Sequence, residues 1–298
     1  MKIKDVQGLL DLKEIKGDMD IDIKGLAYDS RLVKPGDLFF CIRGYNTDGH
    51  DYVRQAINNG CIGLVCERKL DAETPQVIVR NSREAMAKTA AAFFNYPSQS
   101  LLLVGVTGTN GKTTITYLLE SIFYESSKKT GLIGTIENQI NRKSIPVSKT
   151  TPESIDLKRT LREMVEKKVD VVCMEVSSHA IALKRVDETC FDGLMFTNLT
   201  HDHLDFHKTV DDYYKTKKCL FQKYPESIKL INIDDEFGFE IFKDSEEPKK
   251  SFSINKKADY KAENIKLGND GSDFEIIFND NRESIKTKLA GLFNVYNN

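Results

Sequence analysis

The sequence lacks the features that would assign it to a membrane, secreted or nucleic-acid-binding class. No apolar run approaches the roughly 20 residues that cross a bilayer, and the opening Met1–Val6 has no apolar signal-peptide core. A net charge of −2 is too small to favour nucleic acid or an anionic membrane as a partner. Repeats and low-complexity tracts are also absent. These absences predict a globular cytoplasmic protein that binds neither membrane nor nucleic acid.

Cysteine is sparse and has no metal-binding or disulfide pattern. The six cysteines are scattered, none forms a Cys-x-x-Cys pair, and several lie within apolar runs. Reduced cysteines in a core behave as small apolar side chains, so the pattern argues against a disulfide framework or a zinc site. It also agrees with a cytoplasmic location.

The most informative segment is Gly105–Thr114, with the sequence Gly-Val-Thr-Gly-Thr-Asn-Gly-Lys-Thr-Thr. It follows an apolar run and precedes a helical pattern, so it is predicted to join a strand to a helix. Backbone N–H groups at such a turn and helix start bind phosphate. Lys112 would reach the terminal phosphates and Thr113 a magnesium ion. The spacing is unusual, because Val106 stands where the common pattern has its first glycine, and the loop alone fits kinases, GTPases, ATPases and ligases.

Two domains are predicted, over residues 1–97 and 98–298, with a polar boundary at Tyr96–Ser100. The second domain alternates strands and helices, which predicts a mainly parallel α/β sheet with its ligand at the carboxyl ends of the strands. The apolar and aromatic residues 289–298 are typical of the entry to a further helix, so we expect a fragment. Strands are predicted at 37–42, 62–66, 76–79, 101–104, 169–176, 193–197 and 229–233, helices at 53–59, 83–95, 157–167 and 213–221, and a hairpin at 263–288.

Acidic and histidine residues follow two of these strands. Glu175 ends an apolar strand, at the edge of the sheet where a metal-binding acid belongs. Ser177 follows it and could line the same crevice. Zinc is an alternative to magnesium, but no cysteine supports it, and magnesium prefers few protein ligands plus phosphate oxygens. The second strand precedes four further candidates for binding a divalent cation: Asp202, His203, Asp205 and His207.

Together these motifs resemble those of the Mur ligases of peptidoglycan synthesis, most closely the MurE type, the UDP-N-acetylmuramoyl-tripeptide synthetases. The resemblance covers nearly the whole chain. The segment 105–114 is similar to the family's own phosphate loop, including its glycine spacing. The other stretches that carry the resemblance are Asp29–Asp37, Asp48–His50, Thr150–Pro152, Met174–His179 with Arg185, Phe196–Thr200, Asp202–Asp205 and Leu292–Asn297.

The resemblance implies an N-terminal UDP-binding α/β domain and a central ATPase domain with a phosphate loop, incomplete at its C-terminus. It implies ATP and Mg²⁺ as cofactors, and a carbamate derived from CO2 on Lys217. A carbamate supplies the hard oxygen donors that magnesium needs. The catalytic residues would be Lys112, Glu175, His203 and Lys217. The magnesium ligands would be Thr113, Glu175, His203 and carbamylated Lys217.

The resemblance also implies contacts to both substrates. Ser30 would contact the uridine part of UDP-MurNAc-dipeptide, and its muramoyl-peptide part would meet Thr150, Thr151, Ser177 and Arg185. One departure is visible, because many relatives carry glutamine where this chain has Leu183. The residues implied for ATP are Gly105, Thr107, Gly108, Thr109, Asn110, Gly111, Lys112, Thr113, Thr114 and Asn294.

The implied reaction joins a diamino acid, meso-diaminopimelate or L-lysine, to UDP-MurNAc-L-Ala-D-Glu through an acyl phosphate. A MurF-type ligase and a P-loop small-molecule kinase are the alternatives. A GTPase is disfavoured, because the nearest segment to its Asn-Lys-x-Asp motif, Asn255–Ala258, lacks the acid. In the family a third domain supplies the amino-acid pocket and closes over the site. We therefore expect the isolated fragment to be poorly active. We also expect a monomer, the usual state in the family.

Overall fold

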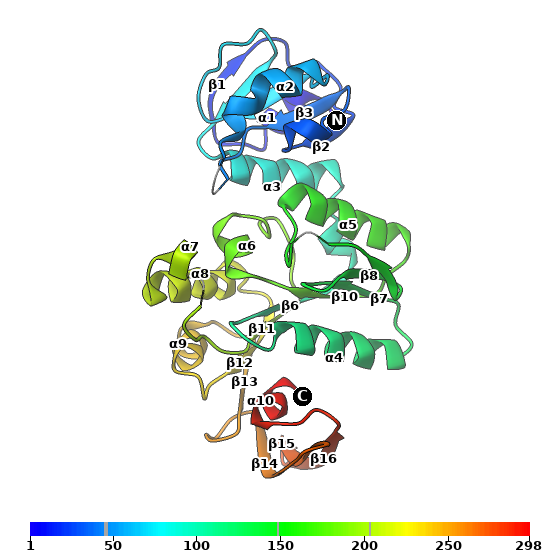
Figure 1. Cartoon of the computed structure of the whole chain (residues 1–298), viewed down its shortest axis with the longest axis vertical. Helices are drawn as coiled ribbons and strands as arrows, with labels where there is room; N and C mark the ends of the chain where they lie inside the picture. The colour runs from blue at the N-terminus through cyan, green and yellow to red at the C-terminus, as the bar shows by residue number, and fades with distance from the viewer. Residues whose placement is uncertain (45–46, 148, 203) are drawn as a thin grey trace. The chain divides into compact units, whose positions relative to one another are not determined.

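The computed structural model describes residues 1–44, 47–147, 149–202 and 204–298, and their contacts group into two compact units (Figure 1). The first unit contains residues 1–97, 152–162 and 183–189, and the second contains residues 98–151, 163–182 and 190–298. The grouping differs from the boundary expected at residue 97, because two later segments belong to the first unit. Ile155 explains one of them, since it is fully buried in the apolar core of the first unit.

The first unit is built on a five-stranded sheet in the order β1-β5-β4-β3-β2. Strand β1 is antiparallel to β5, and the other pairs are parallel. Phe39 and Phe40 are fully buried in different apolar clusters, because successive strand residues point to opposite faces. The sheet is therefore covered on both sides. The elements are α1 (Ile3–Gln7), β1 (Leu12–Lys16), β2 (Gly25–Ala27), η1 (Ser30–Leu32), β3 (Asp37–Phe40), η2 (Gly49–Tyr52), α2 (Val53–Asn58), β4 (Gly63–Cys66), β5 (Gln76–Val79) and α3 (Ser82–Phe93).

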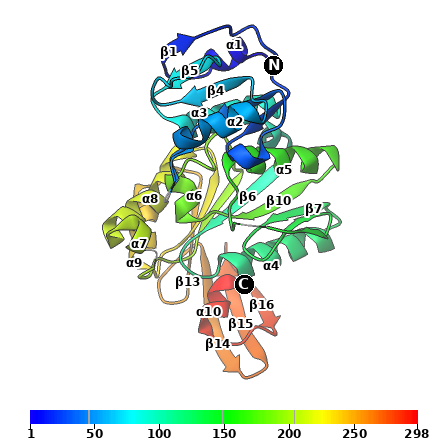
Figure 2. The same ribbon diagram turned by 45° about the horizontal axis from the view of Figure 1, so that its top comes forward.

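The second unit contains an eleven-stranded sheet in the order β16-β15-β14-β13-β12-β11-β6-β10-β7-β8-β9. Its middle is parallel from β14 to β7, and antiparallel strands extend it at both ends. Figure 2 shows β14, β15 and β16 together at one of these ends. All five residues of β10 are buried, as expected for a strand inside a parallel sheet. The fold class predicted from the sequence, α/β with a mainly parallel sheet in the second half, is confirmed.

The elements from residue 97 onward carry most of the residues of the candidate site. Helix α5 is divided between the two units. The elements are η3 (Pro97–Ser100), β6 (Leu102–Thr107), α4 (Lys112–Glu125), β7 (Thr130–Ile133), β8 (Asn138–Ile140), β9 (Lys143–Ile145), α5 (Ser154–Glu166), β10 (Val171–Glu175), α6 (Ser178–Ala182), β11 (Gly193–Phe196), α7 (Leu204–His207), α8 (Val210–Lys223), β12 (Ile228–Asn232), α9 (Glu236–Asp244), β13 (Lys249–Ser253), β14 (Tyr260–Gly268), β15 (Gly271–Phe278), β16 (Asn281–Thr287) and α10 (Leu292–Asn297).

The predicted hairpin at 263–288 is wrong in one respect, because the segment contributes to three strands rather than two. The second turn was missed. It consists of Asn279 and Asp280, which both have positive φ, at 47° and 63°. Asn-Asp pairs suit a two-residue hairpin turn of this kind. In the described part of the chain, no helix combines the length and the apolarity that crossing a bilayer requires.

Candidate functional site

The phosphate loop joins the end of β6 to the start of α4, and the segment after β11 holds its backbone. The Thr197 hydroxyl donates to the Asn110 carbonyl oxygen at 2.6 Å, and the Asn110 N–H donates to Asn198 Oδ1 at 3.0 Å. The Thr109 N–H donates to the Asn198 carbonyl oxygen at 2.8 Å. The Thr-Asn-Leu-Thr stretch, noticed in the sequence as a motif, therefore fixes the shape of the loop.

Two glycines of the loop occupy positions where a side chain would be strained. Gly108 has φ +150°, and a Cβ atom there would lie 1.8 Å from Thr197 Oγ1. Gly111 has φ +90° at the N-cap of α4, and a Cβ atom there would lie 2.6 Å from Asn297 Oδ1. Positive φ is costly for residues that carry a Cβ. The glycine spacing of the loop is therefore set by its own close contacts.

Replacing Gly108 with alanine is expected to lower the free energy of unfolding by about 1–3 kcal/mol, the usual cost of overpacking. The added methyl group would collide with Thr197 and break its bond to Asn110. Urea denaturation of the two proteins measures the difference. Gly268→Ala is the matched control, because its Cβ would meet nothing closer than 3.4 Å. Equal stability of the two variants would show that the loop can move away from Thr197 at little cost.

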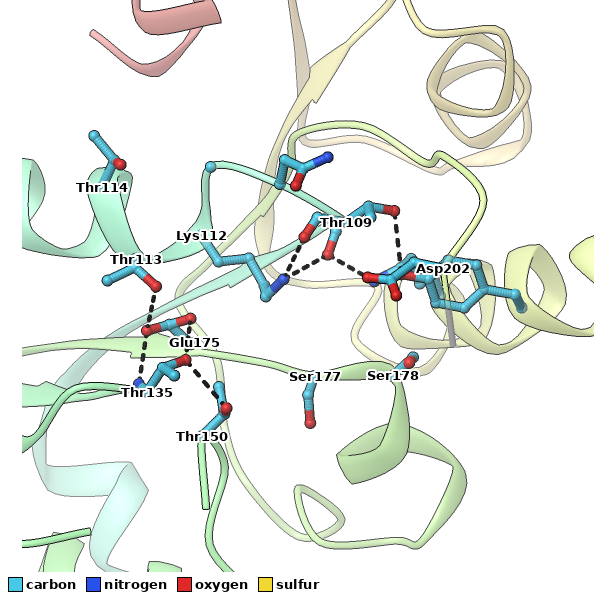
Figure 3. A pocket seen from close by; sticks show the side chains of 15 residues that line it. Thr109, Lys112, Thr113, Thr114, Thr135, Thr150, Glu175, Ser177, Ser178 and Asp202 are labelled. Atoms are coloured by element: carbon cyan, nitrogen blue, oxygen red, sulfur yellow. Dashed lines mark hydrogen bonds between the residues drawn. The ribbon is translucent and has the colours of Figure 1, made fainter. Parts of the chain in front are cut away.

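Lys112 begins α4, and its side chain turns back over the loop (Figure 3). Its Nζ donates to the carbonyl oxygens of Gly108 at 2.9 Å and Thr109 at 2.7 Å. Burial lowers the pKa of Lys112, and the carboxylates of Glu175 and Asp202 oppose that shift. An ammonium group held by carbonyl oxygens can exchange them for phosphate oxygens, which are stronger charge-assisted partners.

Glu175 ends β10 and is 1% exposed. Its Oε1 accepts from the Thr113 hydroxyl at 2.9 Å and from the Thr135 N–H at 2.8 Å. Its Oε2 lies 3.0 Å from Thr135 Oγ1, which in turn lies 3.1 Å from Thr150 Oγ1 (Figure 3). A buried carboxylate next to a threonine hydroxyl is a hard-oxygen donor set, and such a set fits magnesium.

Lys217 lies on α8 and is 1% exposed, although it is a lysine. Its Nζ donates to the Gly108 carbonyl oxygen at 3.0 Å and lies 4.7 Å from the centre of the Tyr213 ring. Burial, together with repulsion from Lys112, holds the pKa of Lys217 well below its usual value, while Asp202 acts in the opposite direction. Burial therefore favours the neutral, nucleophilic amine of Lys217 over the ammonium form.

These side chains line one cavity of about 330 Å³ in the second unit. The cavity lies at the carboxyl ends of β6 and β10, where ligands of parallel α/β sheets bind. The structure brings together most of the residues predicted for ATP and metal binding. Its lining consists of Gly108, Thr109, Asn110, Gly111, Lys112, Thr113, Thr114, Thr135, Thr150, Glu175, Ser177, Ser178, Asp202, Tyr213 and Lys217.

A second cavity, of about 780 Å³, shares Asn110, Gly111 and Thr114 with the first. Its other walls come from the carboxyl ends of β12 and β13, from the segments after β11, β12 and β13, and from α10. Asn297 lines it, whereas the predicted Asn294 is 9% exposed and does not. Asn294 instead donates to the Ala290 carbonyl oxygen and accepts from Asn297 Nδ2 at 3.1 Å.

Three predicted residues of the second unit are accounted for by packing and hydrogen bonds within the protein. Gly105 lies in the middle of β6, where a Cβ atom would lie 2.8 Å from the Phe191 ring, so packing explains the glycine. Thr107 is fully buried at the end of the same strand. The Thr151 hydroxyl is fully buried and donates to the Glu175 carbonyl oxygen at 2.8 Å, which ties the segment before α5 to the end of β10.

Two predicted substrate residues belong to the first unit. Ser30 is 5% exposed, and its hydroxyl donates to Gln55 Oε1 at 2.7 Å. Arg185 forms an ion pair with Glu153 at 2.9 Å, and Arg83 pairs with the other oxygen of the same carboxylate, also at 2.9 Å. Glu153 thus holds two guanidinium groups in one place.

The predicted magnesium ligand His203 lies outside the described residues, and so does the Asp205 side chain. His207 is buried, and its Nε2 lies 2.8 Å from the Ser178 hydroxyl. In the described part of the chain, no group of three or more His, Cys, Asp and Glu side chains makes a metal site. The hydroxyl of Thr113 and the carboxylate of Glu175 remain as donors, and they suit a cation that also binds phosphate.

Sequence reasoning missed several residues that line these cavities, among them Thr135, Tyr213 and Asn297. Asn297 could have been found, because it lies three residues after Asn294, and that spacing places both side chains on one side of a helix. Tyr213 is four residues before Lys217 on α8, which is also a helical spacing. Thr135 had no signal, since it follows a strand in an ordinary turn.

A strand, a glycine-rich turn and a helix start within a parallel α/β sheet define a phosphate-loop protein. The Mur ligase middle domain matches residues 106–298, and a second description, Mur ligase family, catalytic domain, matches residues 22–94. The chain therefore belongs to the Mur ligase family.

Curated relatives carry the name UDP-N-acetylmuramoyl-L-alanyl-D-glutamate–2,6-diaminopimelate ligase. Two of them, from Clostridium acetobutylicum and Clostridium tetani, are 45% and 42% identical over the whole chain. The chain spans 62% of the length of each. A solved structure of a ligase with the same name covers the whole chain with a TM-score of 0.87 at 24% identity, and the match takes in 61% of that chain. The MurF ligase of Thermotoga maritima in complex with ADP has a TM-score of 0.61 at 20% identity, covering 91% of this chain and 60% of its own. These two likenesses show the fold.

Proposed function

We propose that this chain binds UDP-N-acetylmuramoyl-L-alanyl-D-glutamate and activates its carboxylate with ATP, in a ligase that adds 2,6-diaminopimelate. The observation that carries the proposal is the cavity in which Lys112, Thr113, Glu175 and Lys217 meet at one phosphate loop. The names of the curated relatives supply the substrates. The first unit, with Ser30, would bind the uridine part.

The reaction has two steps. A carboxylate oxygen attacks the γ-phosphorus of ATP, the bond to the β–γ bridging oxygen breaks, and ADP leaves an acyl phosphate behind. The amine of the diamino acid then attacks the carbonyl carbon, inorganic phosphate leaves, and the amine loses a proton as the amide forms. Lys112 would neutralise charge on the transferred phosphoryl group, where a fixed charge lowers the barrier most.

Magnesium, when bound, would neutralise phosphate charge and orient the triphosphate. Thr113 and Glu175 would hold it, together with His203 and with Lys217 as a carbamate. The lowered pKa of Lys217 favours that modification, because only the free amine attacks CO2, which forms an N–C bond and releases one proton. The anionic product would then lie near the Lys112 cation, whose repulsion of a protonated Lys217 becomes an attraction.

Trapping the acyl phosphate tests the proposal on this chain itself. The chain is incubated with ATP, Mg²⁺, UDP-MurNAc-L-Ala-D-Glu and hydroxylamine, and mass spectrometry follows the hydroxamate while a coupled assay follows ADP. We expect hydroxamate and ADP in equal amounts, both dependent on the dipeptide substrate. Transfer of phosphate to another acceptor without the dipeptide would favour the kinase alternative. Dependence on the UDP-MurNAc-tripeptide instead would favour the MurF type.

A further inference from the structure

Asp234, in the turn after β12, binds two other segments of the second unit. Its Oδ2 accepts from the backbone N–H groups of Ile254 at 2.7 Å and Asn255 at 3.1 Å, and its Oδ1 accepts from the Ser253 hydroxyl at 2.7 Å. Partial burial would raise the pKa of Asp234, but these hydrogen bonds outweigh it and hold the pKa below its usual value. The group is therefore a fixed anion at neutral pH.

The fourth partner of this carboxylate is Tyr296 on α10. The Tyr296 hydroxyl donates to Asp234 Oδ2 at 2.9 Å and accepts from Asn255 Nδ2 at 3.4 Å. Burial, and then the bond to Asp234, raise the pKa of Tyr296, so the hydroxyl keeps its proton. A charge-assisted hydrogen bond therefore joins α10 to the turns after β12 and β13.

Helix α10 comprises Leu292–Asn297, and the Tyr296 hydrogen bond attaches it to these two turns. Asn297, next to Tyr296, faces the phosphate loop, since its Oδ1 lies 2.6 Å from the Cβ position of Gly111. Four residues of α10 line the second cavity: Leu292, Phe293, Tyr296 and Asn297. The position of this cavity wall therefore depends on the hydrogen bond between Asp234 and Tyr296.

We propose that Asp234 and Tyr296 are positioning residues for the nucleoside part of ATP. Their hydrogen bond fixes α10, and through Asn297 it sets the distance between the wall of the second cavity and the phosphate loop. The inference rests on the proposed function, because it requires ATP to extend from the loop into the second cavity. The phosphate groups themselves are bound by the loop and do not need α10.

The test separates nucleoside binding from phosphate binding. Tyr296→Phe removes the hydroxyl and keeps the ring, and calorimetry measures the Kd of Mg·ADP and of inorganic tripolyphosphate. We expect the Kd of ADP to rise about three- to tenfold. The effect is smaller than the full free energy of a charge-assisted hydrogen bond, because this bond acts on the nucleoside only through the position of α10. The Kd of tripolyphosphate should stay within about twofold, which a general loss of stability would not allow. Tyr260→Phe is the matched control, because no described side chain bonds to its hydroxyl.

A second variant tests whether Tyr296 acts through Asp234. Asp234→Asn keeps an acceptor oxygen and removes the charge, so it should weaken ADP binding in the same selective way. Each substitution removes the same hydrogen bond between Asp234 and Tyr296. The Kd of ADP for the double variant should therefore be no higher than that of the single variant with the higher Kd. Additive effects, or equal losses for ADP and tripolyphosphate, would overturn the positioning role. Failure of the unaltered chain to bind either ligand would instead overturn the proposed function.

Discussion

Lys112→Met is expected to raise the Kd for Mg·ATP by about 10–100-fold, which corresponds to the loss of one charge-assisted hydrogen bond to phosphate. The partly buried ammonium group lies against the loop and bonds to two carbonyl oxygens that phosphate would replace. Hydroxamate formation should fall further, by about 10²–10³-fold, because charge develops on the transferred group in the transition state. Calorimetry gives the first value and the trapping assay gives the second.

Lys128→Met is the control for this variant, because Lys128 is exposed beyond the C-terminal end of the same helix. It should leave both quantities unchanged. If Lys112→Met bound Mg·ATP with unaltered affinity, the loop would not be the triphosphate site, and the function proposed above would lose its main support.

The second large effect is expected at Lys217. Lys217→Ala should reduce hydroxamate formation by about 10²–10³-fold, since the carbamate that would help to hold magnesium cannot form. Added formate or acetate should restore part of the activity by occupying the place of the missing carboxylate. Lys215→Ala is the matched control, because Lys215 lies on the same helix and its side chain is 67% exposed.

The carbamate can also be observed directly. Protein equilibrated with bicarbonate labelled with carbon-13 should show one carbamate resonance, which Lys217→Ala removes and Lys215→Ala retains. Full activity of Lys217→Ala without added carboxylate would contradict the assignment of Lys217 as a metal ligand. Activity without a resonance would show that the amine acts unmodified.

The burial of Lys217 illustrates what the sequence could reveal. Composition alone suggests that the lysines of segment 213–221 face solvent, and Lys215 does. However, Tyr213, Lys217, Leu220 and Phe221 follow the spacing of a single helix face, and all four are buried. Periodicity could therefore have indicated the burial of Lys217, although the lysines taken alone predicted a solvated face, and the chemical role came only from the family resemblance.

Other parts of the site depend on contacts that no local pattern encodes. The strand before the loop and the buried strand ending at Glu175 were predictable, because apolar runs of this kind are typical of parallel sheets. The bond between Thr135 and Glu175 joins residues that are 40 positions apart. The link from Asp234 to Tyr296 spans 62 positions. No sequence pattern marks either pair, because threonine, aspartate and tyrosine are common in turns and short helices.

The antiparallel strands at the two ends of the large sheet have a consequence for solubility. Strands β9 and β16 are the outermost, so each leaves one row of backbone groups unpaired within the sheet. An open edge of this kind can recruit another chain and start aggregation. Most of β16 is exposed and carries Arg282, Glu283 and Lys286, while β9 begins with Lys143 and has only three residues. A strand from another chain that paired at either edge would place its side chains next to these charges. The charged edges therefore discourage association.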